Sequence, residues 1–298
     1  MSRRWKLGGK LLDCSRPRVM AIVNATPDSF FAGSRMPRDA AEAADAIAEL
    51  LSLAPDVVDV GGQSTRPGSK RVPAAEELDR VIPVIQRIRE LDGRVPITID
   101  TYSAEVAREA LAAGADGVND ISGALADDGM LPLLAESDCG YVLMHMLGTP
   151  ETMQQDPQYD DCTGEIFEFL ANRMSALGAA GVAPERVVLD PGIGFGKTLE
   201  HNLELIEQCG RFASLGRPLL YGVSRKSFIG RLGGAGDPAE RLAGTLGVTW
   251  RLLDQGVMLH RLHDVAPAKQ LFAIWEALEQ TRQESEFSEN WQNSGNKT

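Results

Sequence analysis

Residues 57–100 contain two apolar runs separated by an amphipathic segment, and they read VVDVGGQSTRPGSKRVPAAEELDRVIPVIQRIRELDGRVPITID. The runs Val57–Val60 and Ile97–Ile99 are short, continuous and rich in β-branched residues, which is typical of strands buried on both faces of a parallel sheet. Between them, Ala74–Leu91 spaces its apolar residues as a helix does. This stretch therefore predicts a strand–helix–strand unit with a glycine-rich loop after its first strand.

The same unit recurs along the chain. Eight apolar runs end in polar or glycine-rich residues: Val19–Val23, Val57–Val60, Ile97–Ile99, Gly117–Val118, Tyr141–Met144, Val187–Leu189, Leu219–Gly222 and Val257–Leu259. Helix-like segments lie between or after them: Asp39–Leu51, Ala74–Leu91, Ala104–Ala113, Gly164–Ala180, Leu199–Cys209, Pro238–Leu253 and Pro267–Glu279. A doubly wound open sheet more often has about five to seven strands, so eight units favour a closed (β/α)8 TIM barrel of parallel strands.

The chain has 298 residues, a length that allows two domains at about 150 residues each. No linker interrupts the recurring units, and we therefore expect one barrel domain over residues 1–281. Lys6–Leu12 is expected to form a strand that closes the bottom of the barrel. Residues 282–298 are polar and aperiodic, which predicts a disordered tail.

The composition narrows the classes of partner. Thirty Lys and Arg against 42 Asp and Glu give a net charge of −12, which argues against a nucleic-acid or membrane partner but leaves room for a local anion pocket. The four cysteines, Cys14, Cys139, Cys162 and Cys209, lie far apart and form no CxxC pair, as in a reduced protein. The N-terminal segment lacks the apolar core of a signal peptide, so we expect a cytoplasmic protein.

Polar side chains follow all eight runs, where a barrel of this kind collects its chemistry. They are Asn24, Asp28, Gln63, Thr65, Arg66, Asp100, Asn119, Asp120, His145, Asp190, Ser224, Arg225, Lys226, Arg261, His263 and Asp264. Each has an ordinary interpretation alone, since a single Asp at a strand end commonly caps a helix. Their joint occurrence predicts a functional site. Gly192–Thr198 looks like a phosphate-binding loop, but Pro191 occupies the position of its first glycine, which argues against nucleotide hydrolysis.

Several strand-end segments together resemble the dihydropteroate synthases: VMAIVNATPDSF, VDVGGQSTRPGS, ITIDT, GVNDISG, LMHMLGTPETMQ, DPGIGFGKT, GVSRKSFIG and RLHDV. The resemblance implies a transferase of folate biosynthesis. Such an enzyme condenses the pyrophosphate ester of 6-hydroxymethyl-7,8-dihydropterin with p-aminobenzoate and releases dihydropteroate and pyrophosphate. It further implies small-molecule substrates, Mg2+ as cofactor, a homodimer and sensitivity to sulfonamides.

The chemistry of a pterin fits the residues that the resemblance assigns to it. Its guanidine-like edge of N–H donors calls for acceptors, which Asp100, Asn119 and Asp190 supply. The ammonium of Lys226 suits the ring carbonyl, and the guanidinium of Arg261 suits the flat face of the ring. By resemblance, the catalytic residues are Lys226, Arg261, Asp100 and Asp190.

The pyrophosphate end needs positive charge and N–H donors. By resemblance it contacts Asn24, Thr65, Arg66, Arg261 and His263, and Asn24 is also the expected magnesium ligand. The electron-rich pterin delocalises positive charge at its methylene carbon, so a dissociative, SN1-like loss of pyrophosphate requires no covalent enzyme nucleophile.

Two lid loops, Thr26–Met36 and Gly62–Val72, are expected to close over the site and exclude water. The expected contacts of p-aminobenzoate are Phe30, Pro67, Lys226 and Ser227. Gln63 stands where the family usually has Glu, and Phe31–Ser34 departs from the usual first lid, so these positions bear on lid geometry.

Two other functions stay open at this point. A pterin-binding methyltransferase would bind methyl-tetrahydrofolate and need no pyrophosphate. A non-catalytic paralogue would bind a pterin as a sensor, but the intact Lys226, Arg66, Arg261 and His263 argue against a retired site.

Overall fold

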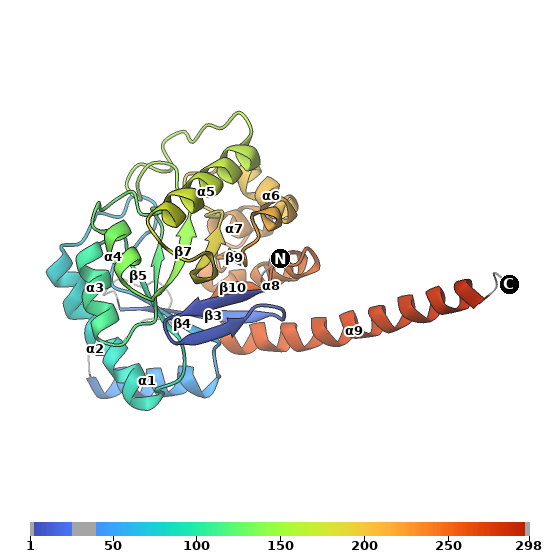
Figure 1. Ribbon diagram of the computed structural model, residues 1–298, viewed down its shortest axis with the longest axis horizontal. Helices are drawn as coiled ribbons and strands as arrows, with labels where there is room; N and C mark the ends of the chain where they lie inside the picture. Colours follow the sequence, from blue (N-terminus) through green and yellow to red (C-terminus); the bar gives the residue numbers. More distant parts are fainter. Residues whose placement is uncertain (1–2, 26–39, 296–298) are drawn as a thin grey trace.

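The computed structural model describes residues 3–25 and 40–295, and within them a barrel of eight parallel strands is surrounded by helices (Figure 1). The barrel strands are β3 Arg18–Asn24, β4 Val57–Gly61, β5 Ile97–Asp100, β6 Gly117–Asp120, β7 Gly140–Met144, β8 Val187–Asp190, β9 Leu220–Tyr221 and β10 Leu259–Leu262. All eight predicted strands are present, which confirms the (β/α)8 fold class.

The helices follow the strands in the expected alternation. They are α1 Ala40–Ser52, α2 Ala74–Leu91, α3 Ala104–Ala112, α4 Met130–Glu136, α5 Cys162–Ala179, α6 Leu199–Glu207, α7 Ser227–Gly233, α8 Leu242–Asp254 and α9 Val265–Gly295. Short 3-10 segments lie at Pro184–Arg186, Cys209–Leu215 and Pro238–Arg241. The sequence did not predict α4 and α7, because two turns of helix are too few to establish a period.

The sheet order is β8-β7-β6-β5-β4-β3-β10-β9. The barrel is nearly closed, because β8 and β9 meet only at a bridge between Leu189 and Leu219. The strand register also aligns the strand ends that carry the polar residues. Asn24 pairs with Gly61, Gly61 with Asp100, and Asp100 with Asn119. Side chains distant in sequence therefore emerge at one level of the barrel mouth.

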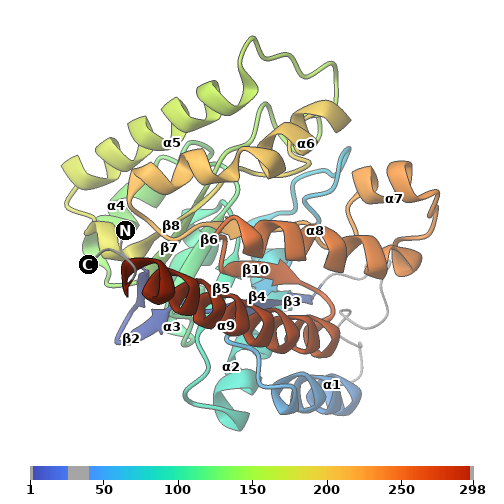
Figure 2. The same cartoon turned by 90° about the vertical axis from the view of Figure 1, so that its right-hand side faces the viewer.

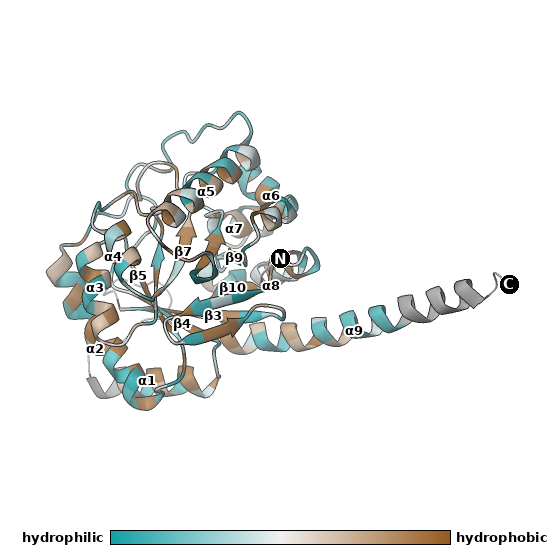
Figure 3. Ribbon diagram, viewed as in Figure 1, coloured by the Kyte–Doolittle hydropathy of each residue, from teal (hydrophilic) through white to brown (hydrophobic). Residues whose placement is uncertain are grey.

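The core lies in two layers, and Figure 3 shows the strands as largely hydrophobic while the helices alternate in character. Between strands and helices, residues such as Val58, Ile85 and Ile97 are fully buried. Inside the barrel, Met20 and Val188 pack in a smaller cluster. Strands buried on both faces account for the continuous apolar runs in the sequence.

The N-terminal segment differs from the single strand expected over Lys6–Leu12. It is a hairpin of β1 Arg4–Leu7 and β2 Lys10–Asp13, because Gly8 adopts a left-handed φ of 54° and turns the chain. Trp5 and Leu7 are fully buried in the inner cluster, and Trp5 Nε1 donates to the Arg186 carbonyl at 2.9 Å. The hairpin therefore covers the barrel at the end opposite the strand termini that carry the polar residues.

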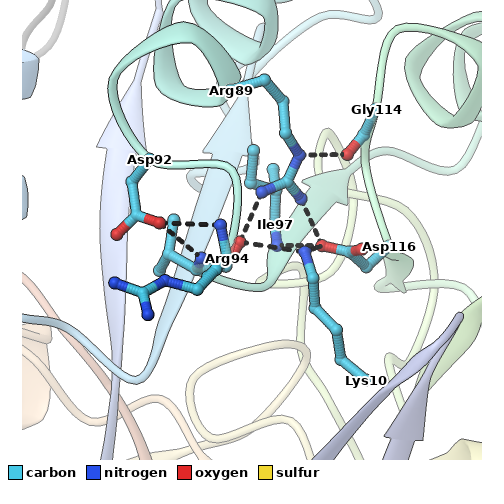
Figure 4. Close-up of polar contacts among 8 residues, drawn as sticks. Lys10, Arg89, Asp92, Arg94, Ile97, Gly114 and Asp116 are labelled. Carbon is cyan, nitrogen blue, oxygen red and sulfur yellow. Dashed lines mark hydrogen bonds and ion pairs between the residues drawn. The ribbon is translucent and has the colours of Figure 1, made fainter.

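Asp116 anchors this hairpin to the barrel (Figure 4). Its Oδ2 accepts from Lys10 Nζ at 2.9 Å and from the Ile97 N–H at 2.8 Å, and Arg89 pairs with the same oxygen. The Arg89 guanidinium also donates from Nε to the Gly114 carbonyl at 2.7 Å. One carboxylate thus joins β2, α2 and β5 at the bottom of the barrel.

Helix α9 covers the seam between β3 and β10 beside α8 (Figure 2), where Val19, Leu262 and Phe272 share a buried cluster. It then projects past the barrel (Figure 1). Residues 282–295 are helical there, whereas the sequence predicts a disordered tail. Side-chain pairs one turn apart, such as Arg282 Nη2 with Glu279 Oε1 at 2.6 Å, support such a helix locally. The end of the barrel domain at residue 281 stays a prediction.

Candidate active site

Three of the expected site residues meet through ion pairs and hydrogen bonds at the barrel mouth. Arg261 on β10 donates from Nη2 to Asp100 Oδ2 on β5 at 2.7 Å, and from Nε to Asp59 Oδ2 on β4 at 2.6 Å. Asn119 Nδ2 on β6 donates to the same Asp59 oxygen at 3.0 Å. The structure therefore brings Asp100, Asn119 and Arg261 together, although Asp100 and Arg261 lie 161 residues apart in the chain.

Sequence reasoning missed Asp59, which lies at the centre of this network. It is 0% exposed within β4, and its other oxygen accepts from Thr98 Oγ1 at 2.5 Å. The signal was present in the sequence, because Asp59 is a lone carboxylate inside the apolar run Val57–Val60. A buried charge is costly unless it is paired and hydrogen-bonded, so a carboxylate within a buried strand indicates nearby donors.

Asp100 combines a paired and an unpaired oxygen. Oδ2 accepts from Arg261, whereas Oδ1 is buried and makes no hydrogen bond within the described part of the chain. Burial raises the pKa of this carboxyl group, and the Arg261 charge opposes the rise. A buried acceptor oxygen such as Oδ1, which has no donor from the described residues, favours the binding of a ligand that supplies an N–H group.

Asp190 and Lys226 belong to the same mouth, because the charge of Arg261 acts on both and that of Asp100 acts on Lys226. Asp190 ends β8, and its Oδ1 accepts from the Gly192 N–H at 2.7 Å. Lys226 Nζ donates to the Ile193 carbonyl and lies 4.4 Å from the centroid of the Phe195 ring. Burial raises the pKa of Asp190 and lowers that of Lys226 to about 8, while the attraction between the two groups opposes both shifts. Phe195 is a further contact of Lys226 that sequence reasoning did not select.

The backbone before Lys226 is held in an unfavourable conformation. Arg225 has φ 57°, in the left-handed region, although it is not a glycine. Its guanidinium forms a forked ion pair with Asp264, and its N–H donates to Thr245 Oγ1 at 2.9 Å. Arg241 Nη1 donates to the Arg225 carbonyl at 3.0 Å. These contacts direct the chain so that Lys226 reaches the loop that follows β8.

That loop is itself tightly packed against the end of β7. Gly192 has φ 74°, and a Cβ there would lie 1.9 Å from the His145 carbonyl oxygen. Lys197 Nζ lies 2.9 Å from the Phe195 carbonyl oxygen and 3.0 Å from His145 Nδ1. Burial lowers the pKa of Lys197 to about 7 and that of His145 to about 2. Lys197 is the lysine of the phosphate-loop-like run Gly192–Thr198. Its ammonium group therefore binds a backbone carbonyl of its own loop.

The surroundings of His263 favour the uncharged form of its imidazole. Its Nδ1 lies 2.9 Å from Ser224 Oγ. Burial, then the charges of Arg261, Arg225 and Arg66, lower its pKa to about 3. An anion at this place would therefore meet an N–H of His263 rather than a positive charge, until the anion itself raised the pKa.

The loop after β4 carries Thr65, Arg66 and Pro67 at the edge of the mouth. Arg66 and Pro67 are exposed and Thr65 is half-buried, while the charge of Arg66 reaches His263. The loop is tied to the β7–α5 connection by a hydrogen bond from the Gly68 N–H to the Pro150 carbonyl at 2.9 Å.

A small pocket opens beside Lys226. Its lining includes Gln154, Gly194, Lys226, Ser227 and Arg231. Ser227 is exposed at the start of α7, and Gln154 Nε2 donates to the Gly194 carbonyl at 2.9 Å. Two of the expected p-aminobenzoate contacts, Lys226 and Ser227, therefore line one pocket. Phe30 and the whole of the first lid, Thr26–Met36, lie outside the described residues.

The comparison with known proteins is decisive for the family. A model described as pterin binding enzyme matches residues 20–263. The dihydropteroate synthase of Synechocystis sp. is 44% identical over 88% of this chain and 90% of its own length.

The chain belongs to the dihydropteroate synthase family.

Solved dihydropteroate synthases share its structure as well. The Yersinia pestis dihydropteroate synthase, in a sulfonamide drug complex, matches with a TM-score of 0.88 and 37% identity, covering 93% of this chain and 99% of the other. The Xanthomonas albilineans dihydropteroate synthase with 4-aminobenzoic acid gives a TM-score of 0.84 and 40% identity, with 94% and 99% covered. The Burkholderia cenocepacia dihydropteroate synthase complexed with 7,8-dihydropteroate gives 0.84 and 38%, with 94% and 98% covered. As a dihydropteroate synthase, the chain is a transferase.

One departure from the usual dihydropteroate synthase pattern has a clear structural setting. Gln63 is buried, and its Oε1 accepts from the Val72 N–H at 3.3 Å and from the Tyr102 hydroxyl at 3.3 Å. The first of these bonds ties the beginning of the loop after β4 to its end. An amide keeps these acceptor contacts without burying a charge, so the substitution preserves the base of the loop.

Among the residues that the structure describes, a metal ion would find few protein ligands at this mouth. In residues 3–25 and 40–295, no group of three or more His, Cys, Asp or Glu side chains is arranged to hold one. Asn24 ends β3 at the mouth and offers an amide oxygen. Mg2+ usually keeps several waters and binds one or two protein oxygens together with substrate phosphates, so this donor set fits an ion that arrives with a pyrophosphate.

None of the described helices is long and apolar enough to span a membrane.

Proposed function

We propose that this dihydropteroate synthase joins the amine of p-aminobenzoate to the methylene carbon of 6-hydroxymethyl-7,8-dihydropterin pyrophosphate. The products are 7,8-dihydropteroate and pyrophosphate. One observation carries the proposal: the acceptors Asp100 and Asn119 share a network with the cation Arg261 at the mouth of the barrel. A Xanthomonas relative with 4-aminobenzoic acid and a Burkholderia relative with 7,8-dihydropteroate support the choice of substrates.

The pterin end of the substrate would lie among the acceptors. We assign the ring's N–H donors to Asp100, Asn119 and Asp190, and its carbonyl acceptor to Lys226. The buried, unpaired Oδ1 of Asp100 supports this assignment, because a buried acceptor without a donor costs free energy that a ligand N–H would recover. Arg261, whose side chain is 22% exposed, would stack on the ring.

The pyrophosphate would lie toward the loop after β4. We assign its contacts to Asn24, Thr65, Arg66, Arg261 and His263. Ser224 Oγ accepts from the His263 backbone N–H at 3.2 Å and lies 2.9 Å from Nδ1, and we assign its hydroxyl hydrogen to Nδ1. In that tautomer the Nε2 of His263 carries the hydrogen and donates to a phosphate oxygen. The chain as a whole has a net charge of −12. The positive charge at this end of the site would therefore come from Arg66 and Arg261.

We also assign magnesium to this end of the site, with Asn24 as its protein ligand. When bound, the ion would neutralise charge on the pyrophosphate. The residues of this chain would position the ester and stabilise the departing anion without a covalent intermediate.

The reaction itself would follow a dissociative path. The bond between the methylene carbon and the pyrophosphate oxygen breaks, and its electron pair leaves with the oxygen. The pterin delocalises the positive charge until the amine lone pair of p-aminobenzoate forms the new C–N bond and a proton is lost. Lys226, Ser227 and Pro67, with Phe30, would hold the p-aminobenzoate, and closure of the loops would exclude water that competes for the cation.

Further properties belong to the same proposal. We propose a cytoplasmic homodimer that sulfonamides inhibit at the p-aminobenzoate pocket, with residues 1–281 as its barrel domain. The apolar side chains of Ile274 and Leu278 on α9 are 50% and 56% exposed, which supports an additional contact surface.

A pyrophosphate-release assay tests the reaction. We expect release with both substrates and Mg2+, and a large loss of rate when p-aminobenzoate is omitted. Equal rates with and without p-aminobenzoate would exclude the synthase reaction. Binding of methyl-tetrahydrofolate without any pyrophosphate release would instead favour the methyltransferase alternative, and pterin binding without turnover would favour the non-catalytic one.

A further inference from the structure

Asp59 occupies an unusual place for a charged residue. It lies in the middle of β4, pairs in register with Ile22 of β3 and Thr98 of β5, and is 0% exposed. Its neighbours Val58 and Val60 pack into the apolar layer beneath the helices. An apolar residue at position 59 would avoid the cost of burying a charge, so stability of the strand alone does not account for the carboxylate.

The contacts of Asp59 join two residues of the proposed pterin site. Oδ2 accepts from Arg261 Nε at 2.6 Å and from Asn119 Nδ2 at 3.0 Å, and Oδ1 accepts from Thr98 Oγ1 at 2.5 Å. Burial keeps Asp59 itself out of contact with solvent. Asp59 therefore makes no direct contact with a substrate, and its hydrogen bonds reach the site through Asn119 and Arg261.

We propose that Asp59 is a positioning residue that orients Asn119 and Arg261 for the pterin substrate. This role deepens the proposed function and rests on it for the identity of the ligand.

The contact with Asn119 determines which end of its amide faces the mouth. A carboxylate accepts hydrogen bonds only, so Asp59 binds the NH2 group of Asn119 and turns the amide oxygen away from itself. That oxygen is the atom the site needs, because the pterin edge presents N–H donors. A neutral side chain at position 59 that also donates would remove this preference and permit the flipped amide.

The contact of Asp59 with Arg261 helps to fix the plane of the guanidinium group. Two carboxylates, Asp59 and Asp100, bind different nitrogens of the guanidinium from neighbouring strands. Two such contacts determine the position and the tilt of a planar group. The remaining N–H groups and the face of Arg261 are then presented in one orientation, which a stacking and anion-binding role requires.

The first measurement needs no substrate. The Nε–H signal of Arg261, assigned with Arg261→Lys, should exchange slowly with solvent in the unaltered chain and at least tenfold faster in Asp59→Asn. Asp116→Asn is the matched control, since Asp116 also accepts from two cationic side chains and a backbone N–H but lies at the bottom of the barrel. Unchanged protection of the Arg261 Nε–H in Asp59→Asn would overturn the proposal.

The second measurement separates the two substrates. Calorimetry with 6-hydroxymethylpterin should show affinity at least tenfold weaker in Asp59→Asn, and KM for the pterin pyrophosphate should rise while KM for p-aminobenzoate stays within twofold. In an Asn119→Ala background, the effect of Asp59→Asn on pterin affinity should shrink, because part of it acts through Asn119. A loss shared equally between both substrates, or no loss, would contradict the positioning role.

A milder variant covers the case in which Asp59→Asn does not fold. Thr98→Val removes one of the three donors to Asp59 without changing its charge, and should weaken 6-hydroxymethylpterin binding about twofold to fivefold. Unchanged pterin affinity in folded Thr98→Val would overturn the proposal. If the unaltered chain bound the pterin but released no pyrophosphate, these binding and exchange measurements would still decide the role of Asp59, while the proposed reaction would be wrong.

Discussion

Arg225 and Asp264 form a forked ion pair that joins the loop before α7 to the end of β10. Arg225 Nε donates to Asp264 Oδ2 at 2.9 Å, and Nη2 donates to Oδ1 at 2.5 Å. Both side chains are largely buried, at 6% and 14% exposed. The pair connects two strand-end motifs of the sequence, and it holds Arg225 in the left-handed conformation from which Lys226 extends.

Asp264→Asn should therefore affect both stability and turnover. Loss of one partner leaves a buried guanidinium without its counter-charge, and we expect the free energy of unfolding to fall by about 3 kcal/mol. Turnover should fall at least tenfold even well below the melting temperature, because Lys226 loses its support. Denaturant titration and pyrophosphate release measure the two effects. The control is Glu207→Gln, which breaks the exposed Arg251–Glu207 ion pair and should change neither the free energy of unfolding nor turnover. Normal turnover in Asp264→Asn would refute the link to Lys226.

Lys226→Ala should lower turnover at least about a hundredfold, the usual loss when one electrostatic donor is removed from a site. The pKa of Lys226 is lowered to about 8, so its ammonium form dominates below pH 8 and is lost as the pH rises through that value. Turnover of the unaltered chain should thus decline on the alkaline side of about pH 8. Lys226→Arg should move this decline upward, since a guanidinium stays charged. A pH–rate profile with the same alkaline limb in both proteins would assign the limb to another group.

Asp190→Asn should weaken pterin binding more than p-aminobenzoate binding. The amide retains one acceptor but loses the charge that attracts N–H donors, and it also introduces a competing NH2 group beside Lys226. Calorimetry with 6-hydroxymethylpterin and with p-aminobenzoate gives the two affinities separately. The reverse order of losses would place Asp190 in the wrong half of the site.

Gly192→Ala should be severely destabilising, because its Cβ would collide with the His145 carbonyl oxygen and its φ of 74° disfavours side chains. We expect a loss of several kcal/mol, at the upper end of single substitutions. Gly178→Ala is the matched control, since this glycine lies inside α5 with open space around its Cβ position and should gain up to about 1 kcal/mol. Thermal melts of the two variants should therefore shift in opposite directions; a small effect in Gly192→Ala would mean that the loop after β8 relaxes freely.

The strands and the residues at their ends could be predicted because burial on both faces leaves a continuous apolar signal that stops where the strand leaves the sheet. Asp100, Asn119 and Arg261 were found in this way, and the register brings them to one level. Asp59 was missed because it interrupts a strand rather than ending it, and single positions inside a run carry little periodic signal. Its partners come from three other strands, which no local pattern reveals.

Other differences have local causes. The hairpin at the N-terminus depends on a left-handed Gly8, which breaks what otherwise reads as one strand. Beyond its buried contacts, helix α9 carries polar pairs one turn apart, in which Arg282 and Gln283 both donate to Glu279. It therefore lacks the apolar stripe by which helices are recognised. The low pKa of His263 arises from burial and from cations on separate elements, and only the assembled fold brings these together.

The pairing of β3 with β10 has a consequence during biosynthesis. Leu259 of β10 lies opposite Arg18 of β3, so the first barrel strand to leave the ribosome meets this partner only when almost the whole ring has been translated. At about 5–20 residues per second, that wait is on the order of tens of seconds. Throughout it, the nascent chain exposes an unsatisfied strand edge, which makes newly made copies candidates for chaperone capture and for pairing with one another in crowded polysomes.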